Sequence, residues 1–177
     1  TLRDAYAPVF AGQESVTARE LRLAAYLRGR DIAPVVAAAR QPHRQHVFLV
    51  GFPRSGTTLL EHVLSSHPDV EAMEERDAFD TVIRDFTGGN AGFDRFAALS
   101  DAALEPHRAA YWATVARFGN RATAPVFIDK MPLNTLMLPV IARLFPDAKI
   151  LFALRDPRDV VLSCFRRRFA LNPGMYE

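Results

Sequence analysis

Residues 47–58 read Val-Phe-Leu-Val-Gly-Phe-Pro-Arg-Ser-Gly-Thr-Thr, and this stretch decides the fold of the 177-residue chain. Its first four residues form a short, continuous apolar run, which is typical of a strand buried on both faces of a parallel sheet. The run ends at Gly51, and the helical spacing of apolar residues begins at Leu59. We therefore expect a buried strand, a glycine-bearing loop and a helix in direct succession.

The same alternation continues along the chain. Further apolar runs occupy residues 126–128 and 150–154, and further segments with helical spacing occupy residues 111–118, 136–144 and 160–165. Strands that alternate with helices predict a parallel sheet with right-handed crossovers. The fold class is therefore α/β, a P-loop-type parallel sheet flanked by helices. Pro139 falls inside one helical segment, where we expect a kink or a late start.

The chain divides at the polar stretch 41–45, which contains Pro42. Before it we expect a helix over 15–29, in which Thr17 and Glu20 have capping-box spacing, and a shorter helix over 32–40. This predicts a helical N-terminal segment, residues 1–42, and a core, residues 43–177. Because the chain stops a few residues after a predicted helix, we expect the core to be incomplete at its C-terminus.

Charge and composition narrow the functional classes. The net charge is only +2, so we expect no nucleic-acid partner, and any anion site must be built locally. The single cysteine cannot form an internal disulfide, and no apolar run approaches the roughly 20 residues of a membrane span. No histidine or cysteine pair has zinc-ligand spacing. We expect a cytoplasmic domain without a membrane segment or a metal site, and a homo-oligomer stays open.

The loop after the first strand has the features of an anion site. Gly51 and Gly56 have P-loop spacing, and the N–H groups and dipole of the following helix would favour an anion. Three hydroxyls stand at the same helix N-terminus, those of Ser55, Thr57 and Thr58. They argue against the alternative of a turn that merely joins a strand to a helix.

The charge of the loop distinguishes it from a nucleotide-hydrolase loop. Thr57 occupies the position at which such enzymes have a phosphate-binding lysine, so chemistry other than that of ATP is indicated. Arg54 can supply the positive charge as a planar fork that suits phosphate or sulfate oxygens.

These motifs resemble those of the sulfotransferases that use 3′-phosphoadenosine-5′-phosphosulfate (PAPS). Residues 52–58 resemble the family's 5′-phosphosulfate loop, and residues 154–159, Leu-Arg-Asp-Pro-Arg-Asp, with Ser163 resemble its 3′-phosphate motif. Residues 53–59 and 66–70 with Glu74-Glu75 are most similar to the tyrosylprotein-sulfotransferase branch and its bacterial relatives. The resemblance implies PAPS as co-substrate, 3′,5′-ADP as product, no metal, and a hydroxyl acceptor on a peptide, glycan or small molecule.

Lys130 follows Asp129, directly after the apolar run 126–128. Lys130, Gly51 and Arg155 all lie just past the ends of predicted strands, and such ends share the ligand-binding edge of a parallel sheet. There Lys130 could stabilise a leaving phosphate, and it also resembles the family's lysine in an Asp-Lys-x-Pro context. The alternative is a solvated lysine paired with Asp129.

The acceptor hydroxyl needs a base, and adjacent carboxylates at 74 and 75 could raise one pKa toward a useful value. We expect only one of these neighbours to face the cleft. Counted from Arg54, Glu75 corresponds to the catalytic glutamate of the tyrosylprotein branch, so the resemblance makes Glu75, Lys130 and Arg54 the catalytic candidates. His67 is the rival base, although its Ser-His-Pro-Asp context favours a turn that ends a helix. A solvated acidic face is the other alternative.

The second half of the donor site lies in residues 154–163. Asp156 as N-cap and Pro157 at the first helical position begin a helix, so Arg155 precedes the cap and Ser163 lies two turns into the helix. A salt-bridged loop between Arg155 and Asp156 is the alternative. The acceptor pocket is expected to use residues 77–96.

Two other functions compete with sulfuryl transfer. A P-loop kinase or NTPase would need a loop lysine and a Mg²⁺-binding acid after an apolar strand, but this chain has Thr57 and Arg155 there. A non-catalytic anion- or nucleotide-binding module, with N-terminal helices that dock a partner, is the second alternative.

Overall fold

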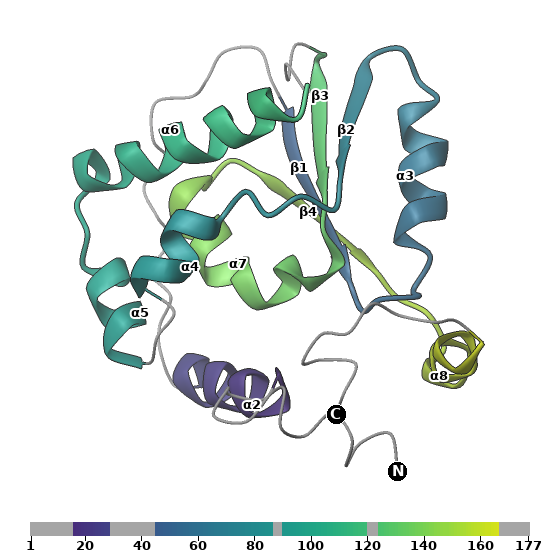
Figure 1. Cartoon of the computed structure of the whole chain (residues 1–177), viewed down its shortest axis with the longest axis horizontal. Helices are drawn as coiled ribbons and strands as arrows, with labels where there is room; N and C mark the ends of the chain where they lie inside the picture. Colours follow the sequence, from purple (N-terminus) through teal and green to yellow (C-terminus); the bar gives the residue numbers. More distant parts are fainter. Residues whose placement is uncertain (1–15, 29–44, 87–89, 120–123, 167–177) are drawn as a thin grey trace. The chain divides into compact units, whose positions relative to one another are not determined.

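Four parallel strands form a sheet in the order β2-β3-β1-β4 (Figure 1). The computed structural model describes residues 16–28, 45–86, 90–119 and 124–166. The strands are β1 (Gln45–Gly51), β2 (Val70–Glu74), β3 (Val126–Lys130) and β4 (Lys149–Ala153). The predicted α/β class with a parallel sheet flanked by helices is therefore confirmed.

The chain divides into two compact units. Pro34–Val160 form one unit, here called the core, and Thr1–Ala33 with Val161–Glu177 form the other. Helix α2 (Val16–Leu27) confirms the helix predicted over 15–29, and it belongs to the second unit. The helix predicted over 32–40 lies outside the described residues, and the predicted boundary at residues 42 and 43 stays a prediction.

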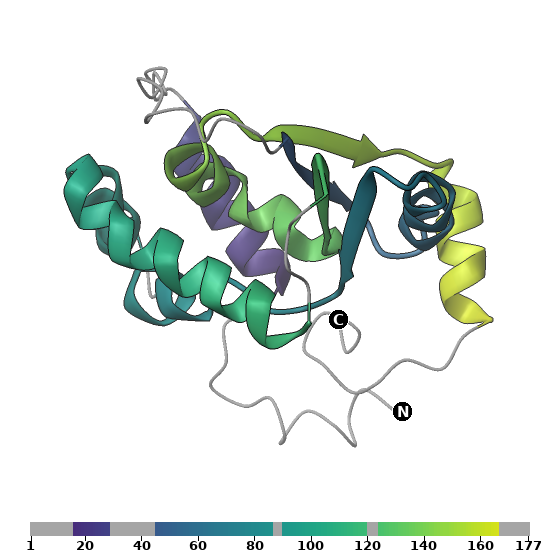
Figure 2. The same cartoon turned by 90° about the horizontal axis from the view of Figure 1, so that it is seen from above.

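The continuous apolar run of β1 is explained by burial on both faces. Val47 and Leu49 pack with Ile128 against helix α3 (Thr57–Ser65). Phe48 points the other way, toward Tyr111 of α6 (Asp101–Arg117). Successive side chains of a strand alternate between the faces, so each face of the central strand has its own apolar contacts. Figures 1 and 2 show α3 and α6 on opposite sides of the strands.

Several elements depart from the periodicity that predicts them. The segment 136–144 begins as a 3₁₀ helix, η2 (Pro132–Met137), and continues as α7 (Leu138–Leu144), with Pro139 in its first turn. The expected late start is confirmed, because proline is tolerated where its missing N–H has no helical partner. Strand β2 and two short helices, α4 (Asp80–Phe86) and α5 (Asn90–Ala97), were not predicted.

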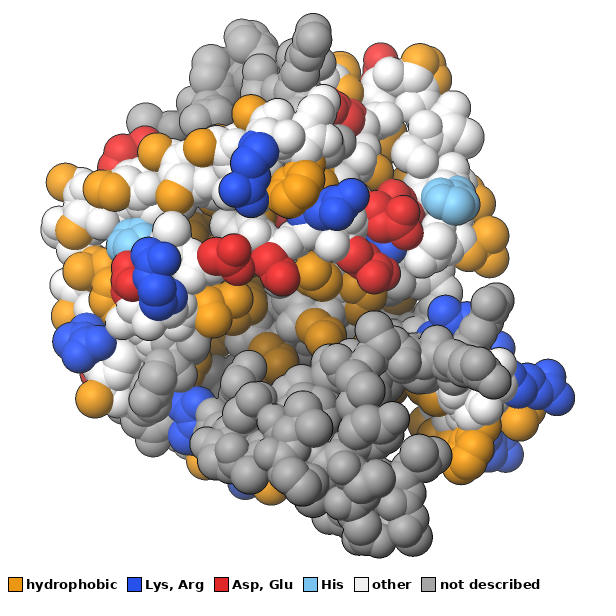
Figure 3. All heavy atoms as spheres, in the orientation of Figure 1, with side chains coloured by type: hydrophobic (Ala, Val, Ile, Leu, Met, Phe, Trp, Pro, Cys, Tyr) orange, Lys and Arg blue, Asp and Glu red, His pale blue; other side chains and the backbone are white. Residues whose placement is uncertain are grey.

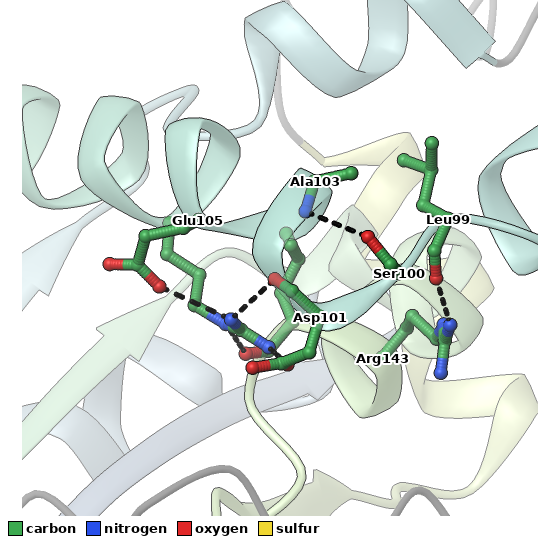
Figure 4. A network of polar contacts seen from close by, with 8 residues as sticks. Leu99, Ser100, Asp101, Ala103, Glu105 and Arg143 are labelled. Atoms are coloured by element: carbon green, nitrogen blue, oxygen red, sulfur yellow. Dashed lines mark hydrogen bonds and ion pairs between the residues drawn. The ribbon is translucent and has the colours of Figure 1, made fainter.

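Polar contacts fix the start of α6 (Figure 4). The Ser100 hydroxyl accepts a hydrogen bond from the Ala103 N–H, as an N-cap does. Arg108 of the same helix pairs with Asp101 and Glu105, at 2.6 and 3.2 Å, and its Nε donates to the Leu144 carbonyl at the end of α7. These contacts tie α6 to α7 on one face of the sheet.

The strand register brings the carboxyl ends of the strands to one edge. Lys130 lies opposite Leu49 on one side and Glu74 on the other, and Gly51 lies opposite Ala153. The loops that follow β1, β3 and β4 therefore leave the sheet at one edge, as the sequence predicts, and the loop that follows β2 joins them. Within the described part of the chain, no helix is long and apolar enough to cross a membrane.

Candidate anion and proton-transfer site

The glycine loop, residues 51–56, connects β1 to α3 and depends on its two glycines. A Cβ at Gly51 would lie 2.7 Å from the Ala153 carbonyl oxygen, so glycine lets β4 approach closely. Gly56 has φ 94° and ψ 13° and is the N-cap of α3, a left-handed conformation that glycine adopts without steric cost. Because the N-cap residue Gly56 has no side chain, no side-chain hydrogen bond caps the first N–H groups of α3.

Arg54 occupies the most constrained part of this loop. Its φ is 73°, which is unusual for a residue with a side chain. Its carbonyl oxygen accepts a hydrogen bond from Arg155 Nη1 at 3.2 Å. The two arginines that the sequence assigns to separate halves of the donor site therefore meet in the structure.

The hydroxyls at the start of α3 differ in exposure. Thr57 is only 4% exposed, whereas Thr58 is exposed and Ser55 is half-buried. Thr58 Oγ1 accepts a hydrogen bond from Lys130 Nζ at 3.4 Å. The loop and the end of β3 are thus joined directly, as the convergence of strand ends predicts.

Lys130 is the centre of a polar cluster, and its side chain has no exposed surface. Its Nζ lies 2.8 Å from Glu75 Oε1, 3.0 Å from Glu74 Oε1 and 3.4 Å from Glu61 Oε2. We call these three carboxylates, Thr58 and Lys130 the Lys130 cluster. Acidic side chains gather near the end of β2 in Figure 3, where Glu74 and Glu75 are about half exposed.

The cluster shifts the pKa values of its members. Burial alone would lower the pKa of Lys130, but the hydrogen bonds to Glu75 and Glu74 outweigh burial and raise it. The hydrogen bond from Lys130 in turn lowers the pKa of Glu74. Both groups are therefore charged at neutral pH. The pKa of Glu74 is therefore lowered, and not raised as it could be in an adjacent carboxylate pair.

The expectation that only one of Glu74 and Glu75 faces the cleft is wrong. Both side chains reach the same ammonium group. The cause is the backbone of Glu75, whose φ of 43° interrupts the alternation of the strand as β2 ends. Its N–H still donates to the Lys130 carbonyl at 2.8 Å, so Glu75 stays beside β3.

Asp129 belongs to a different network on the opposite face of the sheet. It does not pair with Lys130; its Oδ2 accepts a hydrogen bond from the Tyr111 hydroxyl at 2.8 Å. The same hydroxyl lies 2.9 Å from His46 Nε2, so the imidazole must donate to it through Nε2–H. This buried chain, His46 to Tyr111 to Asp129, lies directly behind the Lys130 cluster.

The other candidates have simpler surroundings. His67 lies in the turn between α3 and β2, and its Nδ1 accepts the Asp69 N–H at 3.2 Å, in keeping with the turn that its context favours. Asp156 pairs with Arg158 and caps α8 (Pro157–Phe165), so the alternative of an Arg155–Asp156 salt bridge is not observed. Ser163 lies in α8 within the second unit, and its donor-binding role stays a prediction.

Glu61 was missed by the sequence reasoning. It lies four residues after Thr57 on α3, is 6% exposed, and points toward Lys130. A single acid within the apolar spacing of residues 59–64 is the signal that could have revealed it. In the described part of the chain, no group of three or more potential ligands is arranged to hold a metal ion.

A strand, a glycine loop and a helix, with a buried lysine at the end of the neighbouring strand, define an α/β protein of the P-loop type. The model of the sulfotransferase family matches residues 46–177. The chain therefore belongs to the sulfotransferase family.

Individual relatives agree with this family. Protein-tyrosine sulfotransferase 1 of Mus musculus is 31% identical over 131 residues, which are 71% of this chain and 35% of that protein. Protein-tyrosine sulfotransferase of Drosophila melanogaster is 29% identical over 71% of this chain and 26% of that protein. Nodulation protein NoeE of Sinorhizobium fredii is 34% identical over 76% of this chain and 32% of that protein. The chain spans less than half the length of these curated relatives.

Proposed function

We propose that the protein transfers a sulfuryl group from PAPS to an acceptor hydroxyl, with Glu75 as general base. One observation carries the proposal: Lys130 Nζ contacts both the carboxylate of Glu75, at 2.8 Å, and the hydroxyl of Thr58, at 3.4 Å. The proposed base, the proposed cation and the loop proposed for the phosphosulfate are thus within one cluster.

The donor would occupy the glycine loop and the start of α3. Arg54, Ser55 and Gly56, followed by Thr57 and Thr58, would hold the 5′-phosphosulfate through N–H groups, hydroxyls and the guanidinium. Arg155 and Ser163 would hold the 3′-phosphate. The contact of Arg155 with the Arg54 carbonyl supports a shared donor site, because it places Arg155 at the loop.

The reaction would be an in-line displacement at sulfur. The acceptor oxygen forms a bond to sulfur while the bond from sulfur to the bridging phosphate oxygen breaks. The acceptor proton passes to Glu75, and Lys130 stabilises the charge that develops on the bridging oxygen. Because positioning and charge neutralisation supply most of the catalysis in such transfers, a rigid cation beside the loop is the central requirement.

Glu75 is suited to the role of base because of its exposure. Its side chain is 53% exposed although it is bonded to Lys130, so it can turn toward an acceptor from solvent. The names of the mouse and fly relatives make a tyrosyl peptide the first acceptor to test. Glycans and small molecules with a hydroxyl are the next. A cytoplasmic location and a homo-oligomer stay predictions.

Calorimetry with the full protein tests the donor. We expect 3′,5′-ADP to bind without metal and 5′-ADP to bind far more weakly, since Arg155 and Ser163 are proposed to hold a 3′-phosphate, which 5′-ADP lacks. Equal affinity for these nucleotides would remove the basis for PAPS as donor. Tight binding of ATP with Mg²⁺ in place of 3′,5′-ADP would instead favour the kinase or NTPase alternative. Transfer of labelled sulfate from PAPS to a tyrosyl peptide would then identify the acceptor class.

A further inference from the structure

The Lys130 cluster contains more acceptors than Lys130 can satisfy. A lysine ammonium has three N–H donors. In the structure these donate to Glu75, Glu74 and Thr58. Glu61 Oε2 also lies 3.4 Å from Nζ, but it is buried and has no hydrogen-bond partner. Four acceptors therefore compete for three donors, and the one left over is the one that water cannot reach.

The three carboxylates also differ in their freedom to move. The Glu61 side chain is 8% exposed, whereas those of Glu74 and Glu75 are 55% and 53% exposed. A half-exposed carboxylate can leave Lys130 and be solvated, but a buried one without a donor is unfavourable. If Glu75 releases a Lys130 N–H, Glu61 Oε2 is close enough to accept it.

We propose that Glu61 is a positioning residue that takes over a Lys130 N–H when Glu75 turns to the acceptor hydroxyl. The proposal rests on the proposed function, in which Glu75 acts as base. Without a substitute partner, Lys130 would lose its contact with Glu75, the shortest of its four, when Glu75 takes the acceptor proton. Glu61 keeps the Lys130 ammonium against α3, the helix that follows the glycine loop.

The position of Glu61 on α3 supports this role. Residues four apart on a helix lie on the same face, so Glu61 stands one turn below Thr57. Thr58 and Glu61 thus hold Lys130 from the same helix, and Glu74 and Glu75 hold it from β2. The ammonium keeps its place at the loop when the β2 contacts loosen. A purely structural role for Glu61 would give no such exchange.

A double-mutant cycle in urea tests the exchange without any need for activity. Glu61→Met should change the urea midpoint little, because Glu61 accepts no Lys130 N–H while Glu75 holds one. Glu75→Ala should lower the urea midpoint only slightly, because Glu61 then accepts the N–H that is set free. The double variant should lose more than the sum of the single losses. Glu105→Ala is the control for Glu75→Ala, since Glu105 pairs with Arg108 instead of Lys130. The effects of Glu61→Met and Glu105→Ala on the urea midpoint should therefore be additive. Additive losses for Glu61 and Glu75 would overturn the proposal.

Turnover provides the second readout. Glu61→Met should lower kcat by up to about 10²-fold, the cost of a misplaced catalytic group, while 3′,5′-ADP affinity stays close to that of the wild type. Glu61→Gln keeps an acceptor oxygen and should recover most of the loss. An unchanged kcat in folded Glu61→Met would also overturn the proposal. If the wild type neither binds 3′,5′-ADP nor transfers sulfate, the proposed function fails, and the urea cycle still decides the exchange.

Discussion

Glu75 and Lys130 are joined twice. The Glu75 N–H donates to the Lys130 carbonyl oxygen at 2.8 Å, and Lys130 Nζ donates to the Glu75 carboxylate, also at 2.8 Å. The backbone bond fixes the end of β2 against β3, so the side-chain bond can open without moving the chain. The proposed base and the proposed cation therefore keep their register while the carboxylate is free to change partner.

The first prediction concerns the base. Glu75→Gln should leave 3′,5′-ADP binding intact and lower turnover by roughly 10²–10⁴-fold, the usual contribution of general-base catalysis. The amide still accepts a hydrogen bond from Lys130 but takes no proton. Turnover assays with the full protein, combined with calorimetry, measure the two effects separately.

Glu74→Gln is the matched control for this variant. It removes one charge beside the same ammonium, at 3.0 Å, but not the proposed base, so its effect on turnover should be much smaller. Near-normal turnover in Glu75→Gln, or an equal loss in Glu74→Gln, would remove Glu75 as base. His67 would then be tested next.

The second prediction concerns Arg54 and its backbone. Among the described residues, the non-glycine residues with positive φ are Arg54 and Glu75, both of them site candidates. Strain of this kind persists where the surrounding structure over-determines it, often at functional sites. Arg54→Ala should weaken 3′,5′-ADP or PAPS binding by about 2 kcal/mol, because a bound anion loses a bidentate partner.

Arg54→Gly separates the side chain from the strain. It should lose as much donor affinity as Arg54→Ala does. Its free energy of unfolding should nevertheless be about 1 kcal/mol higher than that of Arg54→Ala, because glycine adopts a φ of 73° without steric cost. Equal stability of the alanine and glycine variants would show that the left-handed backbone carries no strain. Unchanged donor affinity in both variants would make the loop purely structural.

The sequence predicted most of what local pattern controls. The apolar run of β1, the glycine at φ 94° and the lysine at the end of β3 all follow from short-range signals. Strand β2 was missed because Val-Glu-Ala-Met-Glu is weakly apolar, and its partial burial comes from packing beside β3. Burial by a neighbouring strand is a tertiary effect that the segment does not encode by itself.

Side-chain partners were harder to predict than strand ends. Strand alternation led to the expectation that either Glu74 or Glu75 would face the cleft, and a single backbone angle at Glu75 reversed it. The acid of Glu61 within an apolar helix marks the position as unusual, but its partner, Lys130, becomes visible only when α3 and β3 are packed together.

The third prediction concerns the network behind the site. Tyr111→Phe keeps the ring that packs against His46, Phe79 and Phe145, but it leaves Asp129 Oδ2 and His46 Nε2 without their partner. Each unsatisfied buried group costs about 1–3 kcal/mol, so the variant should unfold at clearly lower urea. Val115→Ala on the same helix face removes apolar contacts alone and serves as a comparison. Wild-type stability in Tyr111→Phe would show that the hydroxyl chain contributes nothing.

The last prediction concerns the pH dependence of stability. Burial raises the pKa of Asp129 from 3.8 to about 7, so between these values the folded chain binds a proton that the unfolded chain releases. The contribution of Asp129 to the free energy of unfolding therefore falls as the pH rises through this window. Burial lowers the pKa of His46 from 6.5 to about 3, so the His46 contribution is present above 6.5 and is lost as the pH falls.

The two contributions oppose each other where the windows overlap, and substitution separates them. Asp129→Asn removes only the first, so relative to the wild type its urea midpoint should drop as the pH is lowered from 7 toward 4. His46→Gln removes only the second, and its midpoint should rise relative to the wild type over the same range. Both comparisons use the change with pH, so a constant loss from altered hydrogen bonds cancels. Profiles that run parallel to the wild type would show that neither buried group titrates with the pKa assigned to it.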